Sequence, residues 1–166
     1  MTEFLKVFEP NQTIHKLNET EKSYHFPFPL DDFQKHSHYC ISKKEHVLVT
    51  AHTGSGKTVV ADYAIAQCLS ENKRVVYTSP IKTLSNQKYK EFSDTYPSVG
   101  IMTGDIKLNI DAQCVIMTTE ILRNLLYKDE SQIEDEFKNF MNDVDCVIFD
   151  EVHYINDPNR GEVWET

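Results

Sequence analysis

The 166-residue chain lacks the features that mark membrane, secreted and disulfide-stabilised proteins. No apolar run approaches the roughly 18 residues that cross a bilayer, and no basic segment followed by an apolar core stands at the N-terminus. Only four cysteines occur, far apart, and none has a partner at zinc-site spacing. We therefore expect an intracellular protein with no membrane partner; nucleus and cytoplasm both remain open.

Positive charge is also scarce. The chain has 17 Lys and Arg against 26 Asp and Glu, which gives a formal net charge of −9. This balance argues against a protein that holds nucleic acid by bulk charge. Binding through a local surface of backbone N–H groups and a few lysines is still compatible with it.

The few cysteines and histidines have plain structural interpretations. Three of the cysteines fall inside apolar segments, which favours small buried thiols. His36 and His38 stand close together but have no neighbours of metal-ligand type, which favours solvated side chains.

Residues 1–25 are polar and mixed, and we expect an N-terminal extension there, followed by a helix at 33–42 capped by Asp31 or Asp32.

From residue 46 onward, short apolar segments typical of strands alternate with longer segments typical of helices. We expect strands at 46–50, 74–78, 99–102, 114–118 and 146–149, and helices at 57–70, 83–93, 119–127 and 133–141. Short, wholly apolar, β-branched strands are typical of a parallel sheet covered on both faces. The pattern predicts a layered α/β fold, in which ligands bind at the carboxyl ends of strands.

A glycine-containing loop joins the first expected strand to the next helix. It consists of Ala51, His52, Thr53, Gly54, Ser55, Gly56, Lys57 and Thr58. The two glycines let backbone N–H groups turn inward, Lys57 can reach outer phosphates, and the Thr58 hydroxyl suits Mg²⁺. Except for Ala51 in the first glycine position, this is the phosphate-loop pattern of nucleoside triphosphate enzymes. A glycine turn that binds nothing is the plainer alternative.

Two adjacent carboxylates follow the last expected strand. Asp150 can hold Mg²⁺, directly or through water, while Glu151 can orient and deprotonate an attacking water. His153 can hydrogen-bond across the site to a neighbouring domain. The alternative is an acidic turn after a buried strand.

These motifs and three blocks between them resemble the DExH-box RNA helicases of superfamily 2, in the superkiller-type and exosome-associated branch. The resemblance runs from about Phe26 to the end, and its blocks are 51–58, 78–89, 100–105, 115–123 and 147–154 with 160–165. It implies a three-layer RecA-like P-loop NTPase domain over 26–166 with a mostly parallel sheet, ATP and Mg²⁺ as cofactors, and hydrolysis by Lys57, Glu151 and His153.

The resemblance also implies further contacts. Single-stranded RNA, with DNA left open, would meet Pro80, Lys82, Ser85, Asn86, Gln87, Thr103, Gly104, Asp105, Thr118, Thr119 and Glu120. Hydroxyls, glycine N–H groups and helix N-termini grip phosphates without reading sequence; ordinary helix capping is the alternative for the Ser and Thr residues. Phe28 would stack on adenine and Gln34 would bind its edge, while a hydrophobic staple is the other interpretation of Phe28.

The family's motor has two such domains, and this sequence stops after the DEVH motif. We expect a C-terminally incomplete domain that lacks the Ser-Ala-Thr segment, its strand and the second RecA-like domain with its arginines. One hypothesis is therefore an ATP-dependent RNA helicase, with RNA-decay machinery as a partner, represented by its first motor domain. The other is a truncated nucleotide- or RNA-binding module with weak turnover, no unwinding of its own and marginal stability or self-association. A P-loop kinase or GTPase is disfavoured by the DEVH and Ser-Pro-Ile-Lys blocks.

Overall fold

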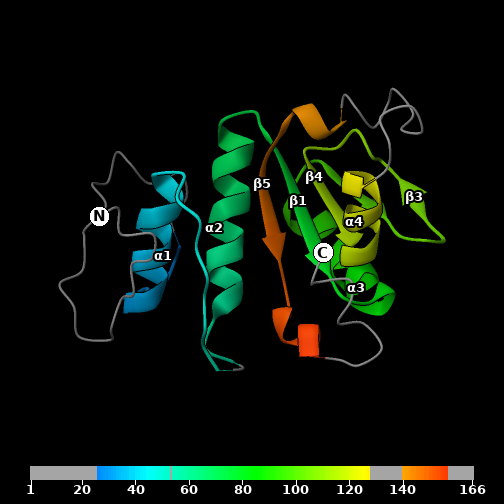
Figure 1. Cartoon of the computed structure of the whole chain (residues 1–166). Helices are drawn as coiled ribbons and strands as arrows, with labels where there is room; N and C mark the ends of the chain where they lie inside the picture. Colours follow the sequence, from blue (N-terminus) through cyan, green and yellow to red (C-terminus); the bar gives the residue numbers. More distant parts are fainter. Residues whose placement is uncertain (1–25, 53, 128–139, 157–166) are drawn as a thin grey trace, which may run out of the picture. The chain divides into compact units, whose positions relative to one another are not determined.

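The computed structural model describes residues 26–52, 54–127 and 140–156 (Figure 1). The chain divides into two compact units, residues 1–70 and 71–166. The expected N-terminal extension, most of the expected helix at 133–141 and the block at 160–165 lie outside the described residues. The single domain over 26–166 stays a prediction.

Two helices make up the described core of the first unit. These are α1 (Asp32–Ser42) and α2 (Lys57–Ser70), both predicted from the sequence. Asp31 is the N-cap of α1, and its N–H donates to the Gln34 side chain at 2.8 Å in a capping box. This reciprocal bond satisfies groups that a helix start otherwise leaves unpaired.

The contacts between α1 and α2 advance along both helices in the same direction. Gln34 Nε2 donates to the Gly56 carbonyl at 3.0 Å, and Gln67 Nε2 donates to the Ile41 carbonyl at 3.3 Å. Between these two bonds, the rings of His38 and Tyr63 stack with centroids 4.1 Å apart. The two helices therefore pack side by side in parallel.

The expectation of solvated histidines was wrong. His36 and His38 are 4% and 2% exposed. Both lie in α1, and the sequence did not show that the face carrying His38 packs on α2. Burial lowers the pKa of His38 from 6.5 to about 4, against the opposing effect of a hydrogen bond with the Val59 backbone.

The expected strand at 46–50 is also absent. These residues have no regular secondary structure and are largely exposed. The apolar run from Val47 to Val49 suits a strand, but a strand requires a partner to complete its hydrogen bonds. Among the described residues no strand pairs with this segment.

The second unit is built around one sheet. Its strands are β1 (Arg74–Ser79), β2 (Val99–Met102), β3 (Lys107–Leu108), β4 (Cys114–Thr118) and β5 (Val144–Phe149). Its helices are α3 (Lys82–Thr95), α4 (Thr119–Tyr127) and the short 3-10 helix η2 (Val152–Asn156). In the described part of this unit the strand order is β3-β2-β4-β1-β5. All pairings are parallel except that of β3, which was not predicted.

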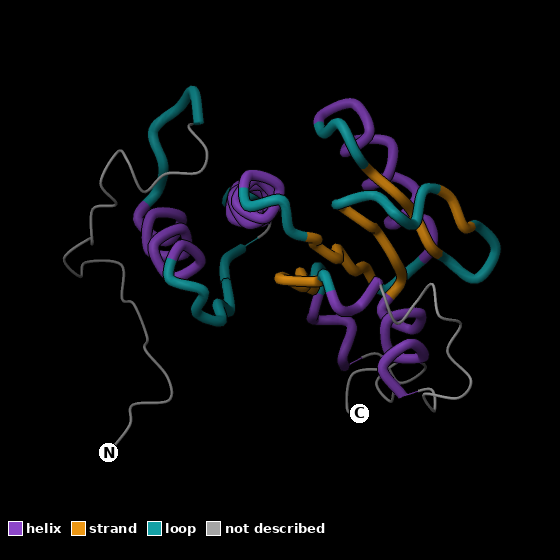
Figure 2. Tube along the Cα trace, turned by 90° about the horizontal axis from the view of Figure 1, so that it is seen from above, coloured by secondary structure: helices purple, strands orange, loops and turns teal. Residues whose placement is uncertain are grey.

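Helices cover both faces of this sheet, as Figure 2 shows from above. On one face Val76 and Val115 join a cluster with Leu122 and Leu125 of α4. On the other, the Tyr77 ring meets Phe92 of α3 edge-on at 5.1 Å. Alternation of neighbouring residues between faces gives three layers, and this confirms the predicted α/β architecture with a mostly parallel sheet.

Strand β5 departs from the prediction that every strand is buried on both faces. β2 and β4 are buried throughout, whereas alternate residues of β5 are exposed, with Val147 at 36% and Phe149 at 48%. In the described part of the sheet β5 is an edge strand. Composition alone does not reveal this position in the sheet.

The cysteines behave largely as predicted. Cys40, Cys68 and Cys114 are buried and Cys146 is half-buried, and all four are free thiols. Burial raises the pKa of Cys114 to about 12, so this thiol stays protonated and unreactive.

In the described part of the chain, no helix combines the length and hydrophobicity needed to span a bilayer.

The burial of His38 predicts a specific pH dependence of stability. Because the pKa is about 4 in the folded chain and 6.5 as its ordinary value, the unfolded chain takes up the proton first as pH falls. Stability is therefore lost from about pH 6.5 down to about pH 4, by about 1.4 kcal/mol per unit of pKa difference. Urea unfolding of wild type and His38→Leu across this range measures the effect. As pH falls, the unfolding free energy of the wild type should decrease relative to that of His38→Leu, because leucine does not take up a proton. A difference between the two proteins that is independent of pH would contradict this prediction.

Candidate functional site

The loop before α2 has the backbone that a phosphate cradle requires. Gly54 and Gly56 have φ of 82° and 83°, in the left-handed region that favours glycine. A Cβ added to Gly54 would meet nothing within 4 Å, so at that position the dihedral angle and not crowding demands glycine. Helix α2 starts at Lys57 directly after this turn, and the N–H groups of a first helical turn attract anions. Thr53 lies outside the described residues.

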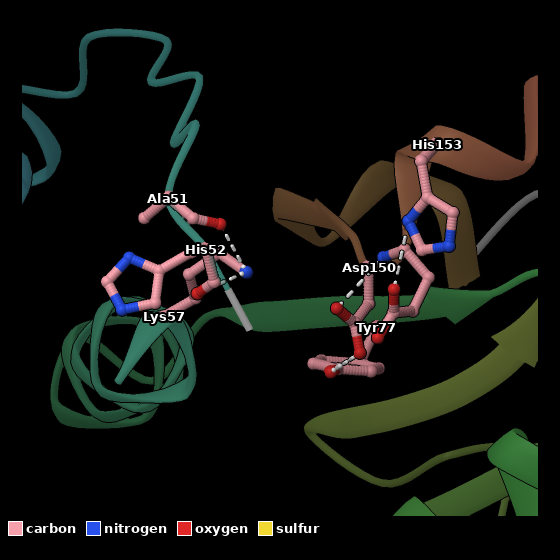
Figure 3. A network of polar contacts seen from close by, with 7 residues as sticks. Ala51, His52, Lys57, Tyr77, Asp150 and His153 are labelled. Atoms are coloured by element: carbon pink, nitrogen blue, oxygen red, sulfur yellow. Dashed lines mark hydrogen bonds and ion pairs between the residues drawn. The ribbon is translucent and has the colours of Figure 1, made fainter. Parts of the chain in front are cut away.

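The Lys57 side chain turns back onto its own loop, as Figure 3 shows. Its Nζ donates to the carbonyls of Ala51 at 2.6 Å and His52 at 3.1 Å. Both acceptors are neutral, and hydrogen bonds to an anionic phosphate oxygen are stronger. The ammonium group can therefore exchange these partners for a phosphate without leaving the loop. The hydroxyl oxygen of Ser55 is covered, and within the part of the chain that the structure describes it has no hydrogen-bond partner.

Phe28 and Gln34, the predicted adenine contacts, lie in this same unit but differ in exposure. Phe28 is 46% exposed and Gln34 only 4%. The Gln34 amide already accepts from the Asp31 N–H and donates to the Gly56 carbonyl. Its observed role is to tie the start of α1 to the end of the loop.

Asp150 follows β5 in the second unit and is held from three sides. Its N–H donates to the Thr78 carbonyl at 3.0 Å, which extends the parallel ladder one residue past the strand. Tyr77 of β1 donates its hydroxyl to Asp150 Oδ2 at 2.5 Å (Figure 3), and the Glu151 N–H donates to Oδ1 at 2.9 Å. Each carboxylate oxygen keeps further acceptor capacity, and such oxygens suit Mg²⁺.

Glu151 and His153 face each other at the start of η2. His153 Nδ1 lies 3.0 Å from Glu151 Oε2, and both side chains are exposed. Glu151 has φ of 54°, an uncommon backbone for a residue with a Cβ. The backbone therefore turns sharply at Glu151, the residue predicted to act on water.

The predicted nucleic-acid contacts divide into exposed and buried residues. The exposed ones are Lys82, Asn86, Gln87, Gly104, Asp105 and Glu120, and the buried ones are Pro80, Ser85, Thr103, Thr118 and Thr119. Several buried hydroxyls already have protein partners. Ser85 Oγ lies 2.7 Å from Ser79 Oγ, the Thr103 hydroxyl accepts the Ile106 N–H at 3.2 Å, and the Thr119 hydroxyl donates to the Ser79 carbonyl at 3.4 Å.

Parallel pairing brings these segments to one edge of the sheet. Ser79 is opposite Thr118, Thr78 is opposite Phe149, and Met102 is opposite Met117. The chain therefore leaves all four strands at the same edge, and the predicted RNA contacts begin there together with Asp150. The phosphate loop belongs to the first unit, so each part of the predicted site is seen within its own unit.

One functional neighbour was missed from the sequence, namely Tyr77. It is 2% exposed, and 73 positions separate it from Asp150. A tyrosine directly after two valines in an expected buried strand was the available signal, because a buried hydroxyl needs a hydrogen-bond partner.

Comparison with known proteins connects these observations. The family model "DEAD/DEAH box helicase" matches residues 31–166. "mRNA transport homolog 4" of Caenorhabditis elegans is 52% identical over 159 residues, covering 94% of this chain and 15% of that protein. "ATP-dependent RNA helicase mtr4" of Schizosaccharomyces pombe is 54% identical over 140 residues (84% and 12%), and "Exosome RNA helicase MTR4" of Homo sapiens is 51% identical over 140 residues (84% and 13%).

This chain thus spans 12–15% of the length of these relatives. Among solved structures, "Sulfolobus solfataricus SWI2/SNF2 ATPase core in complex with dsDNA" has a TM-score of 0.44 at 15% identity. That match covers 87% of this chain and 34% of the other, and so remote a likeness supports no argument.

The pair formed by Lys82 and Asp105 yields a prediction. Lys82 Nζ lies 2.6 Å from Asp105 Oδ2, so a phosphate must compete with this carboxylate for the lysine. Asp105→Asn should tighten binding of single-stranded RNA and steepen its salt dependence by about 0.7 in log–log slope, the value for one added phosphate contact. Fluorescence anisotropy of a labelled oligonucleotide over a salt series measures both. Asp94→Asn, an equal charge change at an exposed position of α3, is the control. Equal effects of the two substitutions would contradict the prediction.

Proposed function

The chain belongs to the DEAD/DEAH box helicase family with a RecA-like α/β fold, and from this premise we propose that it is the nucleotide-binding motor domain of an ATP-dependent RNA helicase. Such a domain couples ATP hydrolysis to movement on RNA or to its unwinding. The observation that supports this most strongly is the loop at 51–58, with two left-handed glycines leading directly into α2 at Lys57.

In this proposal the loop at 51–58 holds the triphosphate. The N–H groups around Gly54 and Gly56 and the first turn of α2 bind phosphate oxygens, and Lys57 moves from the Ala51 and His52 carbonyls to the outer phosphates. The exposed Phe28 ring stacks on adenine. Gln34 contributes a base contact only by exchanging one of its present bonds, and otherwise fixes the loop through Gly56.

Each unit contributes an oxygen atom of the kind that Mg²⁺ prefers: the hydroxyl of Thr58 in the first unit and the carboxylate of Asp150 in the second. Bound Mg²⁺ would neutralise charge on the phosphates. Tyr77 and the Glu151 N–H hold the Asp150 carboxylate in one orientation. Glu151 accepts a proton from the attacking water, and His153, 3.0 Å away, orients the Glu151 carboxylate.

RNA would run along the carboxyl edge of the sheet in the second unit. Lys82, Asn86, Gln87 and the Gly104 backbone are exposed there and provide donors for phosphate oxygens. The buried hydroxyls of Ser85, Thr103 and Thr119 shape these segments through their protein bonds. Sequence-independent grip on one strand is what a translocating motor needs.

Partners of the RNA-decay machinery belong to the same proposal. The human relative, "Exosome RNA helicase MTR4", carries the exosome in its name. A second RecA-like domain is proposed as the partner that completes hydrolysis, because arginines supplied across such a site accelerate phosphoryl transfer by several powers of ten.

Replacing Lys57 tests the phosphate loop. Lys57→Ala removes the only charge that the loop provides among its described residues, so Mg·ATP affinity should fall by at least about tenfold, the scale of a charge-assisted hydrogen bond. Isothermal titration of the wild-type and variant chains measures this. Lys73→Ala, at an exposed position outside the loop, should leave affinity unchanged. Equal ATP affinity in Lys57→Ala and wild type would refute the proposal.

Replacing Glu151 separates binding from turnover. Glu151→Gln keeps the shape of the side chain but removes its ability to accept a proton, so turnover should drop by roughly 10²–10⁴-fold while ATP affinity is kept. Phosphate release measured in the presence of single-stranded RNA gives the turnover rate, and isothermal titration with Mg·ATP gives the affinity. Undiminished hydrolysis would exclude Glu151 as the base.

A further inference from the structure

A stack of three rings, extended by a fourth ring that meets it at a tilt, connects α2 with the exposed Phe28. The His38 imidazole stacks on Tyr63 of α2 with centroids 4.1 Å apart and planes 10° apart. Phe26 also stacks on this imidazole, at 5.5 Å and 24°, so His38 lies between the two rings. The Phe26 ring in turn meets Phe28 at 5.5 Å and 44°.

The two ends of this stack differ in their surroundings. Tyr63 is 1% exposed and belongs to the helix that begins at the phosphate loop. Phe28, at 46%, is the exposed end. Since Phe26 and Phe28 flank Pro27, whose ring restricts the backbone between them, fixing Phe26 also restricts the direction of Phe28.

His38 is held in place by more than its two ring partners. It forms a hydrogen bond with the Val59 backbone in the first turns of α2. One turn earlier on α1, Gln34 binds the Gly56 carbonyl at 3.0 Å. Residues four apart lie on the same helix face, so a single face of α1 contacts the loop, the start of α2 and the aromatic segment.

From these contacts we infer that His38, together with Tyr63 and Phe26, is a positioning group that sets the Phe28 ring for the adenine base of the bound nucleotide. The inference rests on the proposed role of Phe28. It assigns the affinity for the base to a stack anchored in α2, and the affinity for the phosphates to the loop that precedes the same helix. Neither His38 nor Tyr63 touches the nucleotide in this account.

Binding of ATP and of inorganic tripolyphosphate to the full chain separates the two contributions. Tripolyphosphate carries the charges that the loop binds but has no base. His38→Leu should weaken ATP by roughly three- to tenfold, the effect of one aromatic stacking contact, and leave tripolyphosphate affinity unchanged. His38→Phe retains a ring and should restore most of the ATP affinity. His46→Leu, the same substitution at an exposed position, is the control and should change neither.

A double-variant cycle identifies the route of the effect. If His38 acts through Phe28, then His38→Leu combined with Phe28→Leu should bind ATP no more weakly than Phe28→Leu alone. A purely structural role of His38 would instead weaken both ligands, or make the two effects add, and either result overturns the inference.

Failure of the inference and failure of the proposed function give different results. If Phe28→Leu weakens ATP selectively but His38→Leu does not, the inference is wrong and the base contact stands. If Phe28→Leu leaves the ratio of the two affinities unchanged, the proposed base contact is wrong and the inference falls with it.

Discussion

The parallel pairing of β1 with both β4 and β5 is the constraint on which the polar edge of the second unit depends. It places Ser79 opposite Thr118 and Thr78 opposite Phe149, so the three chain segments emerge side by side. The Asp150 backbone is held by its N–H bond to the Thr78 carbonyl, and the Asp150 carboxylate is held by the Tyr77 hydroxyl. The sheet therefore fixes the backbone of Asp150, and Tyr77 of β1 together with the Glu151 N–H fixes its carboxylate.

The first unit achieves the same preorganisation with helices. The face of α1 that carries Gln34 and His38 packs on α2 and on the loop end at Gly56, and a Cβ at Gly56 would come within 2.7 Å of the Gln34 amide nitrogen. The left-handed dihedral angle favours glycine there, and a larger residue would also displace the Gln34 amide from its bond to Gly56. Among the described residues, the printed partners of the Lys57 ammonium are two neutral carbonyls of its own loop, and exchanging them for a phosphate leaves no carboxylate unpaired.

Local signals made much of this structure predictable. Asp31 or Asp32 as a cap predicted a helix at the position of α1, and the buried, β-branched strands β1, β2 and β4 follow from their composition. Long-range contacts were not predictable. The apolar run at 46–50 predicts a strand, but nothing in its own residues reveals whether a pairing strand exists. The residues around His38 predict a solvated side chain, because the Tyr63 ring that covers it lies 25 positions further along the chain. The edge position of β5 and the bond from Tyr77 to Asp150 are likewise products of topology.

Hydrogen exchange of the chain with Mg·ATP, compared with Mg²⁺ alone, measures which segments respond to bound nucleotide. We expect slower amide exchange in two separate segments, the loop and first turn of α2 at 54–60 and the turn at 150–154. Both segments are proposed to serve nucleotide binding, although they belong to different units. Protection confined to other parts of the chain, or no protection at 54–60, would contradict the account.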